Sequence, residues 1–193
     1  MNEPIASTVE KKANLKISTT DIAFVALSAA MIAVCSWISI PAAVPFTLQT
    51  FAIFTVAGLF GMKRGTLAVL VYLLLGAIGV PVLAGMTGGV DKIVGTTGGY
   101  LLGFLPAALL VGYVSQKCKG RLLPLGLAML GGLLICYALG TAWFLLVYTH
   151  TVGAVSLSTV LGWCVLPFIL PDCAKIFCAL ILCNRVRKYV GNR

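Results

Sequence analysis

Long segments of this chain carry no charged side chain. These segments lie between Asp21 and Lys63, between Arg64 and Asp91, between Lys92 and Lys117, and between Arg121 and Asp172. A membrane-spanning helix needs about 20 mostly apolar residues, so the first and last segments are each long enough for two passes. Charged residues make up 10% of the 193 residues and hydrophobic ones 60%, which leaves too few polar groups to cover a water-soluble domain. The sequence therefore predicts an all-α integral membrane protein.

Apolar runs, prolines and glycines predict six transmembrane helices in one membrane domain over residues 21–190, after a cytoplasmic N-terminal tail over residues 1–20. The helices are expected near residues 21–40, 47–62, 66–80, 100–116, 123–148 and 171–188. The last one is predicted to start at Pro171, because proline is favoured at the first helical position. The segment before it is expected to be a separate short helix or a re-entrant piece. A glycine-rich loop over residues 81–99 separates the third and fourth helices.

The basic residues predict the orientation of these helices. With six passes both termini lie on one side, and that side collects all of the 14 lysines and arginines except Lys92 and Lys175. Because lysine and arginine are enriched in cytoplasmic loops, both termini are expected in the cytoplasm of a multi-pass protein of the cell membrane. Dispersal of the basic residues over helix ends favours this interpretation over nucleic-acid binding.

Sequence motifs for catalysis and for ATP binding are absent. The chain contains no GxSxG, HExxH or GxxxxGK[ST] pattern, so it is predicted not to be an enzyme and not to hydrolyse ATP itself. No CxxC pair occurs among its seven cysteines and there is one histidine, so no metal site is expected. An intramembrane enzyme would need a nucleophile beside a base, and the single His150 is expected in an outer loop.

A pair of ionisable residues marks a candidate ligand site on the outer side. Asp172 and Lys175 lie three residues apart in the last helix, so they share one helix face. Ionisable groups in membrane segments cost roughly 2.5–3.5 kcal/mol each on insertion scales and are usually functional. Asp172 is expected in the first helical turn, where the helix dipole favours an anion. We interpret the pair as part of a ligand site, with a purely structural ion pair as the alternative.

Other polar groups are expected on the same side. Thr47 and Gln49 lie just inside the second helix, where they could bind a polar ligand head or cap the helix. The loop from Pro81 to Gly89 is rich in glycine, which lets a ligand approach the backbone closely, although such loops are often plain connectors.

Five ordered motifs complete the pattern. They are VPFTLQ at residues 44–49, YLLLGAIGVPV at 72–82, GTTGGYLLGF at 95–104, YALGTAW at 137–143 and LPFILPDCAK at 166–175. Together they resemble the BioY biotin transporter family, the substrate-binding S components of energy-coupling factor (ECF) transporters. The family's Asp-x-x-Lys signature maps onto Asp172 and Lys175. Its Ala-Gly-Gly-x-Gly-Gly loop maps onto residues 84–89 with Met86 in place of a glycine, and Thr96 replaces a family proline.

This resemblance implies a six-helix S-component bundle that captures biotin in an outward-facing pocket under a glycine-rich lid between helices three and four. It implies partnership with a transmembrane T component and two ATPase subunits, so that ATP is used only by partners and no cofactor is needed. In this interpretation Asp172 accepts the ureido N–H groups, Lys175 balances Asp172 or donates to the ureido oxygen, and Lys92 meets the carboxylate. The expected biotin-binding residues are Asp172, Lys175, Gln49, Thr47, Lys92, Tyr100, Gly88, Gly89 and Tyr137.

The first helix carries small residues at helical spacing. Such faces allow close packing of helices in lipid, and the resemblance implies that this one docks the T component. The residues are Ala26, Ala30, Ala29 and Ala33. Packing within the chain is the alternative. For the whole protein, the alternatives are an S component for a different vitamin and a stand-alone biotin carrier.

Overall fold

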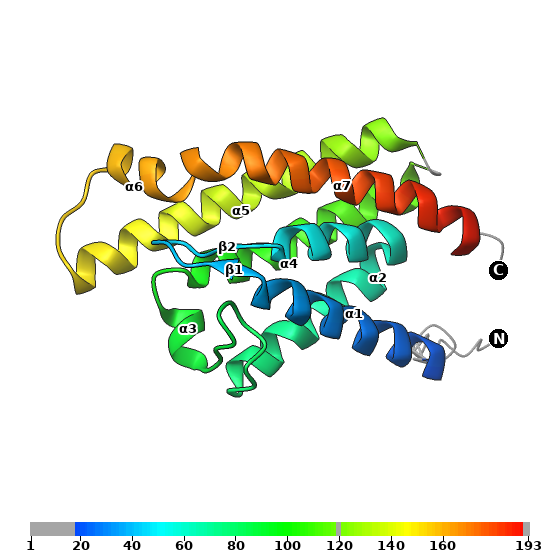
Figure 1. The fold of residues 1–193 in the computed structure, drawn as a ribbon, viewed down its shortest axis with the longest axis horizontal. Helices are drawn as coiled ribbons and strands as arrows, with labels where there is room; N and C mark the ends of the chain where they lie inside the picture. The colour runs from blue at the N-terminus through cyan, green and yellow to red at the C-terminus, as the bar shows by residue number, and fades with distance from the viewer. Residues whose placement is uncertain (1–17, 119–120, 191–193) are drawn as a thin grey trace, which may run out of the picture.

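The computed structural model describes residues 18–118 and 121–190, which form a helical bundle with one short hairpin (Figure 1). Most of the expected N-terminal tail lies outside these residues. The elements are α1 (Thr19–Trp37), β1 (Ser39–Ile40), β2 (Phe46–Thr47), α2 (Gln49–Ala77), α3 (Val90–Val94), α4 (Gly98–Lys117), α5 (Leu122–Thr151), α6 (Leu157–Cys164) and α7 (Leu166–Val190). Antiparallel β1 and β2 pair Ser39 with Thr47 and Ile40 with Phe46.

Five helical segments are long and apolar enough to span a membrane: α1, α2, α4, α5, and α6 together with α7. One of them, α2, folds back on itself at Gly61, whose φ of 76° and ψ of −172° are not helical. The two arms then touch, since a Cβ on Gly65 would lie only 2.7 Å from the Ala57 Cα. A straight helix would hold these residues about 12 Å apart. The predicted six-helix architecture is therefore confirmed, although the bend between helices two and three lies at Gly61, inside the range expected for the second helix.

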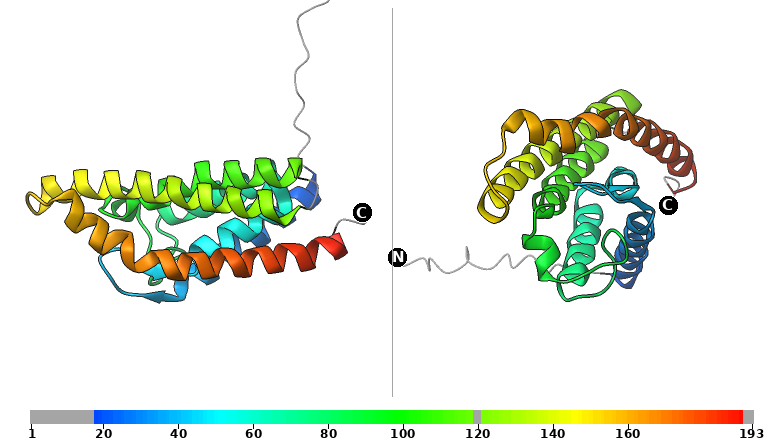
Figure 2. Two further views of the ribbon diagram at one scale, coloured as in Figure 1. Left: turned by 90° about the horizontal axis from the view of Figure 1, so that it is seen from above. Right: turned by 60° about the vertical axis from the view of Figure 1, so that its left-hand side comes forward.

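The two arms of α2 lie at the centre of the bundle and pack against α1, α4 and α7, while α5 packs against α4, α6 and α7 (Figure 2). The core is formed by apolar side chains from these contacts, such as Ile32, Phe54 and Met129. The start of α1 and the end of α7 lie at one end of the molecule, and α3 lies near the other, which we call the distal end (Figure 1). At the first end an ion pair of 2.5 Å joins Arg64 beside the α2 bend to Asp21 of α1.

The predicted start of the last helix was wrong. Helix α7 begins at Leu166, so Pro171 lies inside it and Pro167 takes the second position. Proline is tolerated there because the first amides of a helix have no intrahelical partner. Asp172 consequently lies in the second turn, and the expected contribution of the helix dipole to its site fails. The predicted separate short helix before it is confirmed as α6. His150, expected in a loop, lies in the last turn of α5.

The glycine-rich segment between α2 and α4 is an ordered loop with the short helix α3. A bridge between Leu83 and Thr87 closes its turn, at whose tip Met86 adopts a φ of 55°. Backbone contacts hold the loop to the second arm of α2, where the Gly89 N–H donates to the Gly76 carbonyl at 2.7 Å. The loop is thereby placed over the distal half of the bundle.

Candidate ligand-binding site

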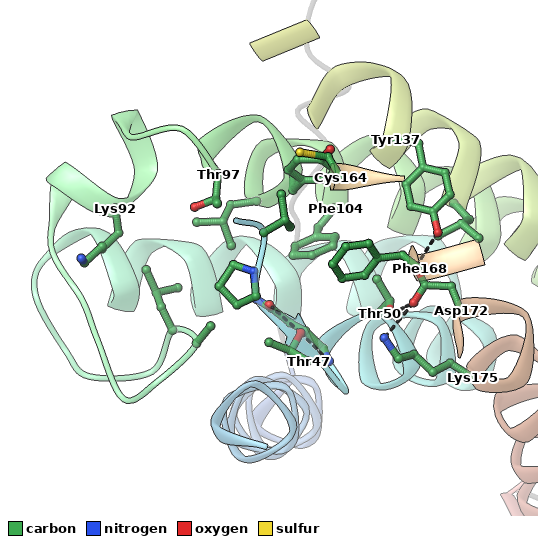
Figure 3. Close-up of a pocket in the computed structure, with 18 of the residues that line it drawn as sticks. Thr47, Thr50, Lys92, Thr97, Phe104, Tyr137, Cys164, Phe168, Asp172 and Lys175 are labelled. Atoms are coloured by element: carbon green, nitrogen blue, oxygen red, sulfur yellow. Dashed lines mark hydrogen bonds and ion pairs between the residues drawn. The ribbon is translucent and has the colours of Figure 1, made fainter. Parts of the chain in front are cut away.

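A cavity of about 240 Å³ lies in the distal half of the bundle, among the β1–β2 hairpin, the loop before α3, and helices α2, α4, α5 and α7 (Figure 3). Ligand pockets usually measure roughly 300–1,000 Å³, so this one suits a compact ligand. Its lining is Val44, Pro45, Thr47, Gln49, Thr50, Leu83, Ala84, Thr87, Lys92, Thr97, Tyr100, Leu101, Phe104, Leu133, Tyr137, Cys164, Phe168, Asp172 and Lys175.

The ion pair of Asp172 and Lys175 forms the charged part of the lining. Lys175 Nζ lies 2.7 Å from Asp172 Oδ1, and the two residues are only 7% and 4% exposed. The Tyr137 hydroxyl donates to Oδ2 at 2.7 Å, and Thr50 Oγ1 donates to Oδ1 at 3.4 Å. Lys175 Nζ also lies 4.0 Å from the ring centroid of Phe46, close enough for a cation–π contact. These partners offset the cost of burying two charges.

The partners of Asp172 leave it able to accept further hydrogen bonds. An ionised carboxylate offers about four acceptor positions, and Tyr137 supplies the single donor found on Oδ2 among the described residues. In Figure 3 the labelled side chains of Tyr137, Asp172 and Lys175 meet at one side of the cavity. A ligand with an N–H group can therefore bind Asp172 without displacing Lys175.

Gln49 and Thr47 form a neutral polar group at the start of α2. Gln49 is 4% exposed, and its Nε2 donates to the Tyr72 hydroxyl at 2.6 Å. Thr47 Oγ1 lies 3.4 Å from Gln49 Oε1 and accepts from the Gln49 backbone N–H at 3.3 Å. Thr47 lies in β2, before the N-cap residue Leu48 of α2, and not inside the helix as expected. It lines the cavity, and its Oγ1 accepts from the first amide of the helix.

The remaining expected residues divide between wall and mouth. Tyr100 lines the wall, and its hydroxyl shares a hydrogen bond of 3.2 Å with Thr141. Lys92 lines the cavity from α3, and its side chain is 49% exposed. Its Nζ lies 3.8 Å from Asp91, a loose surface pair of the kind that contributes little stability. Lys92 is thus the solvent-exposed cation of the lining.

Gly88 and Gly89 do not line the cavity. Gly89 instead begins α3 with a φ of 113°, a backbone conformation that favours glycine, and its amide binds the loop to α2. Gly88 packs against the Val80 carbonyl with no room for a side chain. Their role in the described chain is to shape the loop that carries Leu83, Ala84 and Thr87 to the cavity.

Sequence reasoning missed several lining residues. Thr50, which donates to Asp172, directly follows Gln49, and this polar pair at the start of a membrane helix could have drawn attention to it. Phe104 and Phe168 supply aromatic walls from α4 and α7 (Figure 3). In an apolar helix, the sequence does not distinguish an aromatic residue that lines a cavity from one that faces lipid or the protein core.

The four alanines of α1 divide into two faces. Ala29 and Ala33 are 4% and 5% exposed and pack inside this chain. Ala26 and Ala30 are exposed on the outer side of the bundle. The expected docking face is consequently available only at Ala26 and Ala30, and the alternative of internal packing applies to the other two.

Comparisons with known proteins identify the family. The BioY family model matches residues 8–192. The chain is 43% identical to the "Biotin transporter BioY" of Thermotoga maritima over 82% of this chain and 90% of that protein. It is 38% identical to the "Probable biotin transporter BioY" of Pyrococcus horikoshii, over 86% and 96%. Its fold matches the crystal structure of the S-component for biotin from an ECF-type ABC transporter, with a TM-score of 0.77, 28% identity and 95% of each chain covered. This multi-pass membrane chain belongs to the BioY family of transporters, and not to a family of enzymes.

Proposed function

We propose that this chain binds biotin with high affinity in the cavity and imports it across the cell membrane as the substrate-specific component of an ECF-type transporter. Family membership and the names of its relatives support this role. The observation that carries it is the buried pair of Asp172 and Lys175, which offers a charged acceptor and a charged donor inside a compact, mainly apolar cavity.

The functional groups of biotin match these polar positions. Its ureido ring has two N–H donors and one carbonyl acceptor. Asp172 accepts from an N–H, Gln49 and Thr47 add neutral hydrogen bonds, and Lys175 donates to the ureido oxygen while it balances Asp172. Charged hydrogen bonds of this kind are stronger than neutral ones.

The apolar remainder of biotin suits the rest of the cavity. Its sulfur-containing ring packs against Phe104 and Phe168, and Tyr100 and Tyr137 frame the polar end. The valerate chain leads its carboxylate toward the mouth, where Lys92 is a solvent-exposed cation. Burial of apolar area supplies affinity, and the few polar groups set orientation.

Release into the cytoplasm would require partner subunits. A transmembrane T component would dock on the exposed Ala26 and Ala30 face of α1, where small side chains allow close helix approach. Two ATPase subunits would supply energy, since this sequence contains no phosphate-binding loop. By the positive-inside rule, both termini and the end of the bundle with the Arg64–Asp21 pair would lie in the cytoplasm.

Calorimetry on purified protein with biotin and a panel of other vitamins tests this proposal. Biotin should bind with at least a hundredfold preference. Tight binding of another vitamin in its place would indicate an S component for that vitamin, and the small cavity makes the larger vitamins poor candidates. A second assay follows biotin uptake into vesicles with and without the partner ATPases. Concentration of biotin by this chain alone, with no ion gradient, would instead indicate a stand-alone carrier.

A further inference from the structure

Helix α3 carries Lys92 to the cavity, yet its own packing does not explain how it stays in place. It has five residues, and none of them is buried. Isolated helices shorter than about 12 residues are marginal in water, and a segment without buried side chains gains little from the hydrophobic effect. Contacts at the ends of α3 must therefore fix its position.

Both ends of α3 are tied to other helices by hydrogen bonds. At its start, the N–H of the N-cap residue Gly89 donates to the Gly76 carbonyl of α2 at 2.7 Å. At its end, the carbonyl of the C-cap residue Gly95 accepts from Trp143 Nε1 of α5 at 2.9 Å. Lys92 lies midway between these two ties. Together they hold α3 between the second arm of α2 and α5.

The tie to Trp143 is the one made by a side chain. The tie at Gly89 joins two backbone groups, whereas the tie at Gly95 depends on the indole. Two glycines let the chain pass close to that indole: a Cβ on Gly98 would lie 3.2 Å from Trp143 Nε1, and one on Gly99 would overlap the Trp143 side chain. Trp143 is not among the residues that line the cavity. Its effect on a ligand must therefore pass through α3 or through the packing of α4 against α5.

A second tryptophan holds the other root of the same loop. Trp37 Nε1 of α1 donates to the Pro81 carbonyl at 2.9 Å. Trp37 thus holds the half of the loop that carries Leu83 and Ala84 to the cavity, and Trp143 holds the half that carries Lys92. Tryptophans near the ends of membrane helices often anchor a protein at the level of the lipid headgroups. Here both indole N–H groups bind carbonyls of one loop instead.

Lys92 can distinguish ligands only while α3 stays in place. Its side chain is 49% exposed, and its Nζ lies 3.8 Å from Asp91, which offers a competing partner. In Figure 3 it lies at the far side of the lining from Asp172 and Lys175, where the tail of a ligand bound to that pair would end. Attraction between exposed charges is weak and falls with distance and with salt. A displaced α3 would therefore leave a ligand carboxylate to water.

We propose that Trp143 is a positioning residue that holds α3, and with it Lys92, at the mouth of the cavity, and so makes the site selective for ligands with a carboxylate at the end of an apolar chain. This inference rests on the proposed binding of biotin. Trp143 need not touch the ligand, because its hydrogen bond to Gly95 sets the position of the cation that does.

Competition with labelled biotin at low ionic strength tests this on Trp143→Phe, Lys92→Ala and the double variant, with biotin and its methyl ester as ligands. Phenylalanine keeps an aromatic ring and removes the N–H donor. The wild type should prefer the acid to the ester, and Trp143→Phe should reduce this preference by about twofold to fivefold, no further than Lys92→Ala does. In the Lys92→Ala background, Trp143→Phe should leave the preference unchanged, because residues in one network are non-additive.

Hydrogen exchange followed by mass spectrometry, without ligand, supplies an independent readout. Loss of one neutral hydrogen bond corresponds to local opening that is about threefold to tenfold more frequent. Amides over residues 90–98 should exchange faster by this factor in Trp143→Phe than in the wild type. The increase should be confined to this segment, because the rest of the bundle keeps its contacts.

Matched controls remove the same N–H group elsewhere. Trp37→Phe releases the other root of the loop, so any loss of affinity should be equal for the acid and the ester. Trp163→Phe changes an exposed indole of α6 and should leave affinity and exchange over residues 90–98 as in the wild type. Thermal unfolding in detergent checks that each variant is folded. If Trp143→Phe does not fold, Trp143→Leu, which also removes the donor, decides by the same criteria.

Four outcomes would overturn the inference while biotin binding stands. Unchanged exchange over residues 90–98 in folded Trp143→Phe would show that α3 needs no tie to α5. An unchanged preference for the acid in this variant would show that the position of α3 does not set selectivity. Equal losses for acid and ester would show that the indole acts through the packing of α4 against α5. An unchanged preference in Lys92→Ala would remove Lys92 as the partner of the carboxylate.

Failure of the wild type itself to bind biotin would instead refute the proposed function, and the selectivity inferred here with it. Hydrogen exchange over residues 90–98 would still report on the tie between Trp143 and α3, because that measurement uses no ligand.

Discussion

Lys175 Nζ lies 2.7 Å from Asp172 Oδ1, one helical turn along α7, and both side chains are almost completely removed from solvent. Breaking a buried pair by removal of one partner leaves a charge uncompensated, at a cost of about 3–5 kcal/mol. Removal of either residue is therefore expected to weaken the packing of α7 against α2 and α5 as well as to change the cavity. Experiments on either residue need a separate measurement of folding.

Asp172→Asn should weaken biotin binding by about tenfold to a hundredfold. The change keeps the shape but replaces one acceptor with a donor, and a hydrogen bond to a charged group contributes about 1.5–3 kcal/mol. Calorimetry on protein that remains monodisperse in detergent measures the effect. Lys63→Ala, an exposed position beside the α2 bend, is the control. Unchanged affinity in folded Asp172→Asn would leave the ion pair a purely structural feature.

Lys92→Ala should distinguish biotin from its methyl ester. An exposed ion pair contributes about 0.2–1 kcal/mol, so loss of the lysine should weaken the binding of biotin by about twofold to fivefold. The ester carries no charge, and its affinity should stay the same in wild type and variant. Competition with labelled biotin at low ionic strength gives both values. Equal losses for acid and ester would assign Lys92 to the shape of the mouth and not to the carboxylate.

Bulky substitutions should separate the two alanine faces of α1. Ala26→Phe faces outward, so it should leave biotin binding intact and reduce copurification with the T component and uptake at least tenfold. Ala33→Phe faces the core, where overpacking costs about 1–3 kcal/mol, so it should lower the melting temperature. Affinity copurification and thermal unfolding report the two effects. Normal uptake by Ala26→Phe would place the docking face elsewhere.

Labelling with an impermeant maleimide tests the topology. Single cysteines at position 63 and at position 150 are introduced after the seven native cysteines are replaced. Lys63→Cys should react only from the cytoplasm and His150→Cys only from outside, because these exposed positions follow the bend of α2 and lie in the last turn of α5, which the proposed topology puts on opposite sides of the membrane. Both should react after solubilisation, which serves as the control. Reaction of both from one face of intact cells would contradict the proposed arrangement.

Local features of the sequence were sufficient to predict the six-helix architecture. A bilayer requires every spanning helix to contain about 20 mostly apolar residues, whatever other helices pack against it. The charge-free segments therefore predict the membrane passes without knowledge of how the helices pack. Ionisable groups are costly in lipid, which singles out Asp172 and Lys175. Prolines were less informative, because Pro171 is accommodated inside α7 and the helix begins at Leu166.

The assembly of the site depended on contacts between distant segments. The apolar character of the spanning helices extends all round them, so no polar stripe reveals which face turns inward. The packing of α7 against α2 and α5 brings Thr50 and Tyr137 to Asp172. The packing of α1 against α2 likewise decides which of its alanines are covered, so that Ala29 is buried and Ala30 is exposed.

The sequence by itself determined a six-pass membrane protein with an acid–base pair and a threonine–glutamine pair available for a ligand. Each of those conclusions rests on the cost of exposing a given side chain to lipid, which is a property of one helix. Only the tertiary structure decided that Tyr72 stands behind Gln49 and that Gly88 and Gly89 shape the loop without lining the cavity. Hydrogen bonds and close packing act over about 3–4 Å, so they are set by the mutual placement of helices and not by the order of residues within any one of them.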